Sequence, residues 1–167
     1  KRVFQVGVQR RANAIYQQAA ALVRSGALGP ISAIKCQWHR NNNWRRPVPV
    51  PKTDPKWHAL ERRLNWRLYR ESSAGLMAEL GSHQLDACSI FLGKKHPLAV
   101  LGIGGTFFFR DGREVDDHVF VDFEFPGLGD RKDDRVVVTY SSINTNSFEN
   151  YGEMLMGSQG TMIVEAE

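Results

Sequence analysis

Three residues near the middle of the chain have the types and the spacing that acid–base chemistry requires. Glu79, His83 and Asp86 are four and three positions apart, so on a helix they would lie within about 60° of one another. A carboxylate one helical turn from an imidazole can orient the ring and raise its pKa toward neutrality. The spacing predicts an acid–base centre with His83 and Glu79 as catalytic residues. A polar pair on a solvated helix face is the alternative interpretation.

A second polar group follows residues 31–38, whose alternating apolar side chains predict a strand. The run Trp38-His39-Arg40-Asn41 lies at its end, at the start of an irregular stretch with four prolines between residues 47 and 55. A rigid strand end can aim such side chains, so this run, with His39 and Asn41, is a candidate binding group. A polar strand terminus without further function is the alternative.

The charge of the chain is concentrated in one stretch. The formal net charge is +4, but residues 40–70 hold nine Lys and Arg against two acidic residues, so this stretch is +7 and the remainder −3. All four tryptophans fall within or beside it. Interleaved arginines and aromatic rings can bind a sugar-like molecule or a nucleic acid, or simply pack a long loop. Its place between His39 and His83 favours the wall of a polar pocket over a nucleic-acid patch.

Two helices and a run of strands are expected to position these residues. Apolar residues at helical spacing predict helices over residues 13–25 and 76–92, each followed by a glycine stop. A hairpin at Asp111-Gly112 is predicted to join strands at residues 106–110 and from 113 onward. Further strands are predicted at residues 3–8, 98–103, 119–125, 136–141, 153–156 and 161–164. The sequence thus predicts an α+β fold, with an open, largely antiparallel or mixed sheet of about six strands and helices packed on one face.

Length and composition exclude several classes of protein. The 167 residues, 42% hydrophobic and 24% charged, suit one compact domain and fit neither collagen, a low-complexity chain nor a disulfide scaffold. Cys36 and Cys88 are predicted to be two buried thiols. No apolar run approaches the ~20 residues of a membrane span, and no further Cys or His cluster completes a metal site around His83. The glycines at 102–105 form no dinucleotide motif, because Phe107 replaces the third glycine and a strand follows.

Residues 75–86 follow the pattern Gly-x-x-x-(Asp/Glu)-x-x-x-His-x-x-Asp, and this segment resembles one in the Gfo/Idh/MocA oxidoreductases. Residues 8–11, 26–31 and 156–161 resemble further segments of that family, in the same order and at similar spacing. The resemblance covers nearly the whole chain. It implies that residues 1–167 form a substrate-binding and oligomerisation domain, cut at both ends. The N-terminal dinucleotide-binding domain and its Glu-Lys-Pro segment would be absent.

The resemblance also implies roles for individual residues. His83 matches the catalytic histidine, and Glu79 matches the carboxylate four residues before it, which is more often Asp in the family. Asp86 matches the acidic residue that follows, and His39 and Asn41 resemble a substrate-contacting pair of inositol-dehydrogenase-like members. The expected substrate-binding residues are accordingly His39, Asn41, Asp86, Trp66, Arg67 and Tyr69.

By this resemblance, the chain is expected to be the C-terminal domain of a nicotinamide-dependent oxidoreductase acting on a sugar, polyol or related derivative. NAD or NADP would be bound mainly by the missing domain, so the fragment alone is expected to be inactive. The expected partners are a sugar-like molecule and further copies of the chain, packed through the open sheet face, with neither nucleic acid nor a membrane. The cytoplasm is the favoured compartment, although an export signal could precede the fragment. An NAD-dependent glycoside hydrolase and a non-catalytic binding or scaffold module are the alternatives.

Overall fold

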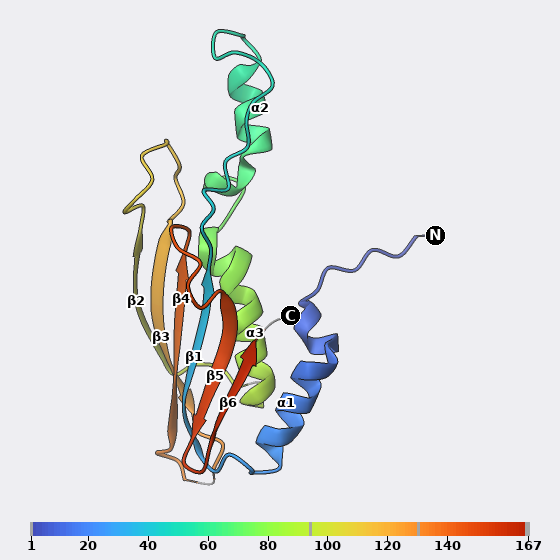
Figure 1. Cartoon of the computed structure of the whole chain (residues 1–167), viewed down its shortest axis with the longest axis vertical. Coiled ribbons are helices and arrows are strands. Elements are labelled where there is room, and N and C mark those ends of the chain that lie inside the picture. The colour runs from blue at the N-terminus through green and yellow to red at the C-terminus, as the bar shows by residue number, and fades with distance from the viewer. Residues whose placement is uncertain (1, 94, 130, 166–167) are drawn as a thin grey trace.

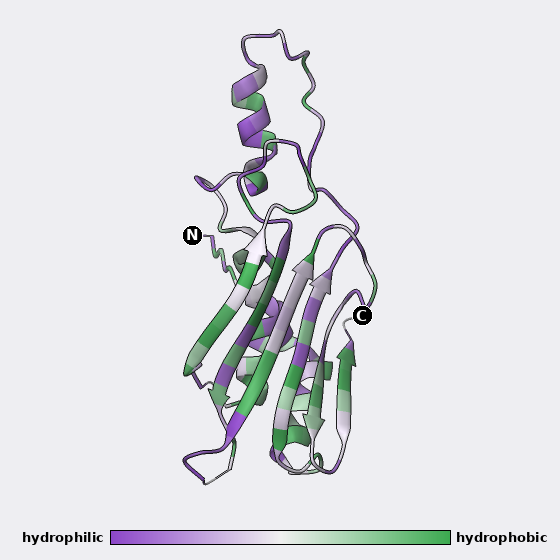
Figure 2. Cartoon of the chain, turned by 90° about the vertical axis from the view of Figure 1, so that its left-hand side faces the viewer, coloured by the Kyte–Doolittle hydropathy of each residue, from purple (hydrophilic) through white to green (hydrophobic). Residues whose placement is uncertain are grey.

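The computed structural model describes residues 2–93, 95–129 and 131–165, which form one layer of strands and one layer of helices (Figure 1). Six strands build a mixed sheet in the order β2-β3-β4-β1-β5-β6. Helices cover one face of this sheet, and the other face is open (Figure 2). The predicted α+β fold is thereby confirmed. The two ends of the chain, which the sequence predicts to be cut, lie outside the described residues.

The strand that leads to the polar stretch, β1 (Ile31–His39), lies inside the sheet. It pairs in parallel with β4 (Arg135–Ile143) and antiparallel with β5 (Tyr151–Gly157). The remaining pairings, all antiparallel, add the outer strands: β2 (Ala99–Gly105), β3 (His118–Pro126) and β6 (Thr161–Glu165). The parallel pairing makes the sheet mixed and places the carboxyl ends of β1 and β4 side by side.

Two helices pack against the sheet. α1 (Ala14–Arg24) begins after Asn13, whose side chain accepts a hydrogen bond from the Ile15 amide at 2.8 Å, and ends before Gly26, which has a φ of +77°. α3 (Ser82–Phe91) follows a π-helical turn at Met77–Gly81, so the predicted helix over residues 76–92 is irregular in its first part. Shorter segments complete the helices: η1 (Gln9–Ala12), α2 (Trp57–Leu64) and η2 (Trp66–Leu68).

The core lies between the sheet and these helices. Ile34, Cys36 and Trp38 alternate along β1 and are all buried, as the strand pattern predicts. Cys88 of α3 lies against Cys36, with the two sulfurs 4.0 Å apart and unbridged, which confirms two buried thiols. This contact joins β1, which carries Trp38, to α3, which carries His83.

Three predicted strands, at residues 3–8, at 106–110 and from 113 onward, are absent from the described residues. The predicted hairpin at Asp111-Gly112 is therefore wrong, and the next strand, β3, begins only at His118. Residues 3–8 are extended without a strand partner, and Val3 is 97% exposed. Residues 106–110 form a loop, because the Asp117 carboxylate accepts hydrogen bonds from three successive backbone amides, those of residues 107–109. Amides that are committed to one side chain cannot also pair with a neighbouring strand.

A third helix, α2, lies within the stretch that the sequence predicts to be irregular. Figure 1 shows it near the tip of an arm that projects beyond the end of the sheet; we call residues 40–70 the arm. Proline lacks an amide hydrogen and disrupts a helix interior, so the segment with four prolines stays irregular. The helix begins at Trp57, two residues after the last of these prolines, Pro55.

A buried ion pair joins the start of the chain to β5. Arg10 and Glu153 are 4% and 1% exposed, and Arg10 Nη1 donates to Glu153 Oε1 at 2.5 Å. Tyr16 donates its hydroxyl to the other carboxylate oxygen at 2.7 Å, and the Arg10 guanidinium lies 5.6 Å from the centre of the Trp38 ring. Burial raises the pKa of Glu153 to about 7, and Arg10 opposes this rise.

Replacing Arg10 with Met should destabilise the fold in a pH-dependent way. The variant leaves Glu153 buried without its cation, so we expect the free energy of unfolding to fall by about 3 kcal/mol at pH 8. At pH 6 the loss should be smaller, because the raised pKa of Glu153 in the folded state lets it take up a proton there. Urea denaturation at both pH values measures the two losses.

The control is Arg135→Met, because its partner Glu124 is on the surface. Loss of an exposed ion pair should lower the free energy of unfolding by less than about 1 kcal/mol. Equal losses for Arg10→Met at pH 6 and pH 8 would contradict the pKa raised by burial of Glu153.

Candidate active site

A cavity of about 520 Å³ opens where β1 ends and the arm begins. Trp38 of β1, Trp44 of the arm and Leu80 of the π-helical turn supply its apolar wall. Its polar lining comprises an amide, a carboxylate, an imidazole and four guanidinium groups, those of Asn42, Glu79, His83, Arg40, Arg45, Arg46 and Arg67. We call this cavity the His83 pocket. It combines groups that can bind polar atoms with one that can move a proton.

His83 lies in the first turn of α3, with its ring centre 5.4 Å from that of Trp38. Its Nδ1 atom is buried and has no hydrogen-bond partner among the described residues. Burial lowers the pKa of His83 below 6.5, Arg10 and Arg40 lower it further, and Asp86 opposes them. The predicted rise in this pKa is therefore wrong, because burial and two cations outweigh one carboxylate. The imidazole is uncharged at neutral pH and can accept a proton.

Glu79 contacts Arg67 and Ser73. Arg67 Nε donates to Glu79 Oε2 at 3.1 Å, and Ser73 Oγ donates to Oε1 at 3.3 Å. No hydrogen bond joins Glu79 to His83 in the part of the chain that the structure describes. The π-helical turn includes Glu79 and ends just before α3, so the helical-wheel angle used for the prediction does not apply across it.

Gly81 lets the π-helical turn approach the sheet closely. A Cβ atom at this position would lie 3.1 Å from Cε1 of Tyr140 on β4, closer than an ordinary van der Waals contact. A larger residue would push the turn away from the sheet, and His83, two residues later, would move with it.

Asp86 lies outside the lining of the His83 pocket, one turn further along α3. Its Oδ1 atom accepts hydrogen bonds from Arg11 Nε at 2.8 Å and from Nη2 at 2.5 Å. Its Oδ2 atom is buried and has no hydrogen-bond partner among the described residues. Because its charge raises the pKa of His83, Asp86 is the carboxylate that acts on the imidazole, a role that the spacing had assigned to Glu79.

The structure places His39 and Asn41 outside the pocket. Alternate residues Trp38, Arg40 and Asn42 line it, whereas His39 Nδ1 donates to the Phe148 carbonyl at 2.8 Å and His39 Nε2 lies 2.8 Å from Ser141 Oγ. Asn41 is exposed and forms an isolated β-bridge with Thr145. Neighbouring residues of an extended chain point to opposite sides, so the selection of His39 and Asn41 from this run took the side that faces away from the pocket. Trp38 belongs to the apolar face of the predicted strand, and its alternation with Arg40 and Asn42 could have identified these two residues as facing the pocket.

Of the three other expected substrate-binding residues, Trp66, Arg67 and Tyr69, only Arg67 lines the pocket. Its guanidinium lies 4.5 Å from the centre of the Trp66 ring. Trp66 itself is 38% exposed and lies outside the pocket lining. Tyr69 is buried and donates its hydroxyl to Glu61, which places it in the base of the arm.

Two carboxylates hold the arm in place. Glu61 of α2 is 3% exposed and accepts hydrogen bonds from Arg45 and Tyr69. Asp111 accepts from Arg113 Nε at 2.9 Å and Arg45 Nε at 3.1 Å, and these arginines hold the pKa of Asp111 well below its usual range. Arg45 therefore joins the arm to the loop that contains Asp111 and supports one wall of the pocket.

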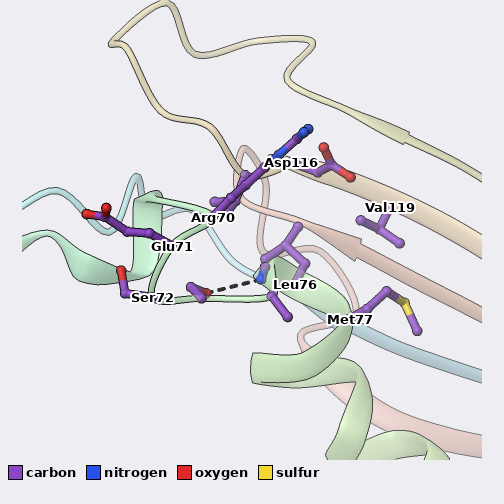
Figure 3. Close-up of a pocket in the computed structure, with 11 residues that line it drawn as sticks. Arg70, Glu71, Ser72, Leu76, Met77, Asp116 and Val119 are labelled. Atoms are coloured by element: carbon purple, nitrogen blue, oxygen red, sulfur yellow. Dashed lines mark hydrogen bonds between the residues drawn. The ribbon is translucent and has the colours of Figure 1, made fainter.

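A second cavity, of about 490 Å³, lies beside residues 70–77 (Figure 3). The Gly75 amide donates to Ser73 Oγ at 3.1 Å, and Figure 3 draws this hydrogen bond as a dashed line. Its charged lining residues are Arg70, Glu71 and Asp116, and its lining includes neither histidine nor cysteine. Histidine is the side chain that ordinarily titrates near neutral pH. The His83 pocket is therefore the better candidate for acid–base chemistry.

The described residues contain no group of three His, Cys, Asp or Glu side chains that could hold a metal ion. Within the same ranges, no helix has the length and apolar character needed to cross a lipid bilayer. The glycines at 102–105 belong to β2, an edge strand followed by a loop, and form no phosphate-binding helix start.

The protonation of His83 can be measured directly by NMR titration of its imidazole. We expect a midpoint below 6.5, and we expect Arg40→Gln to raise it, because one of the two cations that lower this pKa is removed. Arg63→Gln, an exposed change on α2, should leave the midpoint unchanged. A midpoint at or above 6.5 in the parent protein would refute the proposed effect of burial and the arginines.

Comparisons with known proteins place the chain in a family. A model of the GFO/IDH/MocA C-terminal domain matches residues 16–163. Curated protein sequences gave no match. The structure of GenD2 from gentamicin A biosynthesis, in complex with NAD, is similar with a TM-score of 0.68 and 17% identity, over 95% of this chain and 38% of GenD2.

Two further solved structures share the fold. The myo-inositol 2-dehydrogenase of Lactobacillus plantarum has a TM-score of 0.67 and 17% identity, over 99% of this chain and 43% of the enzyme. A super-repressor mutant of Gal80p from Saccharomyces cerevisiae has a TM-score of 0.65 and 16% identity, over 93% and 40% of the two chains. The chain therefore spans less than half the length of each of these proteins. The match over residues 16–163 shows that the chain belongs to the Gfo/Idh/MocA oxidoreductase family and corresponds to the C-terminal domain of its members.

Proposed function

We propose that the chain is the substrate domain of a nicotinamide-dependent oxidoreductase that acts on a sugar, polyol or related derivative. The observation that carries this proposal is His83, which burial and two arginines keep uncharged in a pocket of small-molecule size. Membership of the family supports it. Two structural relatives also support it, namely a myo-inositol 2-dehydrogenase and GenD2 with bound NAD.

His83 is the acid–base residue of the proposed reaction. Its neutral imidazole accepts the proton of a substrate hydroxyl. The carbon that bears this hydroxyl loses its hydrogen as hydride at the same time, so the alcohol becomes a carbonyl. In the reverse direction, the imidazolium returns that proton to the oxygen. NAD or NADP supplies the hydride acceptor when bound, and a separate dinucleotide-binding domain has to hold it.

Two carboxylates assist His83 in different ways. Asp86 raises the pKa of His83 and so offsets part of the lowering by burial and the two arginines. Its negative charge also stabilises the imidazolium that forms during the reaction. Glu79 holds Arg67 at the pocket wall through its hydrogen bond of 3.1 Å. Asp86 therefore acts on His83 electrostatically, and Glu79 organises the surface that faces the substrate.

Changing His83 to Gln should abolish most of the turnover of an enzyme in which this chain is joined to a dinucleotide-binding domain. Loss of a general base typically lowers the rate by about 10²- to 10⁴-fold. Formation of NADH or NADPH, followed by absorbance, measures this rate. Release of sugar without net cofactor reduction would indicate a glycoside hydrolase instead.

The matched control is His58→Gln, which makes the same change at an exposed position of α2. This variant should retain the turnover of the parent enzyme. Activity of His83→Gln within a few-fold of that of His58→Gln would refute the proposed role of His83.

We further propose that copies of the chain associate through the open sheet face. Large apolar side chains lie on this face, and Figure 2 shows the sheet from this side. Leu101 and Ile103 of β2 are 71% and 65% exposed, and Phe120, which pairs with Ile103 on the neighbouring strand β3, is 44% exposed. A cluster of exposed large apolar side chains marks an interaction site in soluble proteins.

Leu101→Glu should shift the protein from oligomer to monomer, because it would bury a charge in the proposed interface. Light scattering after size exclusion measures the molar mass. Leu22→Glu, at an exposed position of α1 on the helix side of the sheet, is the control and should leave the oligomer intact. A parent protein that is monomeric at all concentrations would contradict this proposal.

A further inference from the structure

The four arginines of the His83 pocket are not equally neutralised. Arg45 pairs with Glu61 and Asp111, and Arg67 pairs with Glu79 at 3.1 Å. Neither Arg40 nor Arg46 has a carboxylate partner among the described residues. The pocket therefore has an excess of positive charge on its lining.

Acidic residues outside the basic stretch contact two of its other arginines, Arg62 and Arg70. Arg62 pairs with Glu114 at 3.0 Å and with Glu71 at 3.4 Å. The Arg70 amide and guanidinium also bind the side chain and carbonyl of Glu114. Lys52, Lys56 and Arg63, exposed on the arm, also lack a carboxylate partner among the described residues, but none of them lines the pocket. Arg40 and Arg46 are thus the unpaired cations at the cavity, whose size suits a small anion.

Arg40 is the most constrained of the unpaired cations. Its guanidinium lies 4.8 Å from the centre of the Trp38 ring, which gives it a defined position beside His83. Burial lowers the pKa of Arg40, and the nearby Arg67 lowers it further because the two positive charges repel. A half-buried cation beside a like charge has an unfavourable free energy that a bound anion would relieve.

We propose that the substrate of the His83 pocket carries an anionic group, a carboxylate or a phosphate, that binds Arg40. This inference rests on the proposed function and narrows its substrate class to sugar acids or sugar phosphates. The planar guanidinium can donate two parallel hydrogen bonds to either group. Arg40 is then the residue that distinguishes an anionic sugar from a neutral one.

Binding can be measured on the chain itself, because Trp38 and Trp44 line the pocket and their fluorescence should respond to a ligand. The probes are glucuronate, glucose 6-phosphate and neutral glucose, which share a ring and differ in charge. We expect at least one of the two anions to bind at least 10-fold more tightly than glucose. Added salt should weaken that difference, because mobile ions screen the attraction. The tighter anion identifies whether a carboxylate or a phosphate is preferred.

Variants then assign the effect to Arg40. Arg40→Gln should weaken binding of the preferred anion by at least 10-fold and binding of glucose by much less. Arg40→Lys keeps the charge without the fork of donors, so its loss should be intermediate. Arg63→Gln, exposed on α2, should bind like the parent. Unfolding curves of each variant confirm that the fold is retained.

The proposal is overturned if neither anion binds more tightly than glucose, or if Arg40→Gln and Arg40→Lys bind the preferred anion as the parent does. This failure would leave the redox role of His83 intact, because that role is tested by cofactor reduction. Conversely, an enzyme that turned over equally well with His83→Gln would refute the redox role and leave the measured anion affinity unaffected.

Discussion

The fold and the chemistry of the candidate site both depend on one buried cation, the guanidinium of Arg10. Its ion pair with Glu153 and its contact with the Trp38 ring connect η1 to β5 and β1. The same positive charge lowers the pKa of His83. The buried guanidinium that joins η1 to the sheet thus also helps to set the protonation state of His83, the proposed acid–base residue. A change in this ion pair would therefore alter stability and proton transfer together.

Much of the fold is predictable because burial leaves a periodic pattern in the sequence. β1 alternates buried and exposed residues, and α1 repeats its apolar residues at helical spacing between a capping Asn13 and a terminating Gly26. The wrongly predicted strands, at residues 3–8, at 106–110 and from 113 onward, fail for reasons that periodicity does not show. Residues 106–110 have strand-like composition, but Asp117, several positions later, binds their amides. Residues 3–8 have strand-like composition without a partner strand among the described residues.

The site is less predictable than the fold, because it is made by residues that are distant in sequence. Spacing identifies Glu79 and His83, and both line the pocket. It cannot reveal the π-helical turn that changes the helical phase between Glu79 and His83. Nor can it reveal that Arg40, and not His39, lines the pocket. The sign of the His83 pKa shift depends on burial and on Arg10 and Arg40, which approach only after folding. Reasoning from neighbouring residues alone therefore predicts a shift in the wrong direction.

A crystal structure of the complete protein with NAD and a non-reacting substrate analogue would test the proposed role of His83. If His83 is the acid–base residue, the analogue occupies the His83 pocket, with one imidazole nitrogen of His83 about 3 Å from the reacting hydroxyl. Binding of the analogue in the cavity beside residues 70–77, with His83 contacting neither ligand, would show that His83 has no such role.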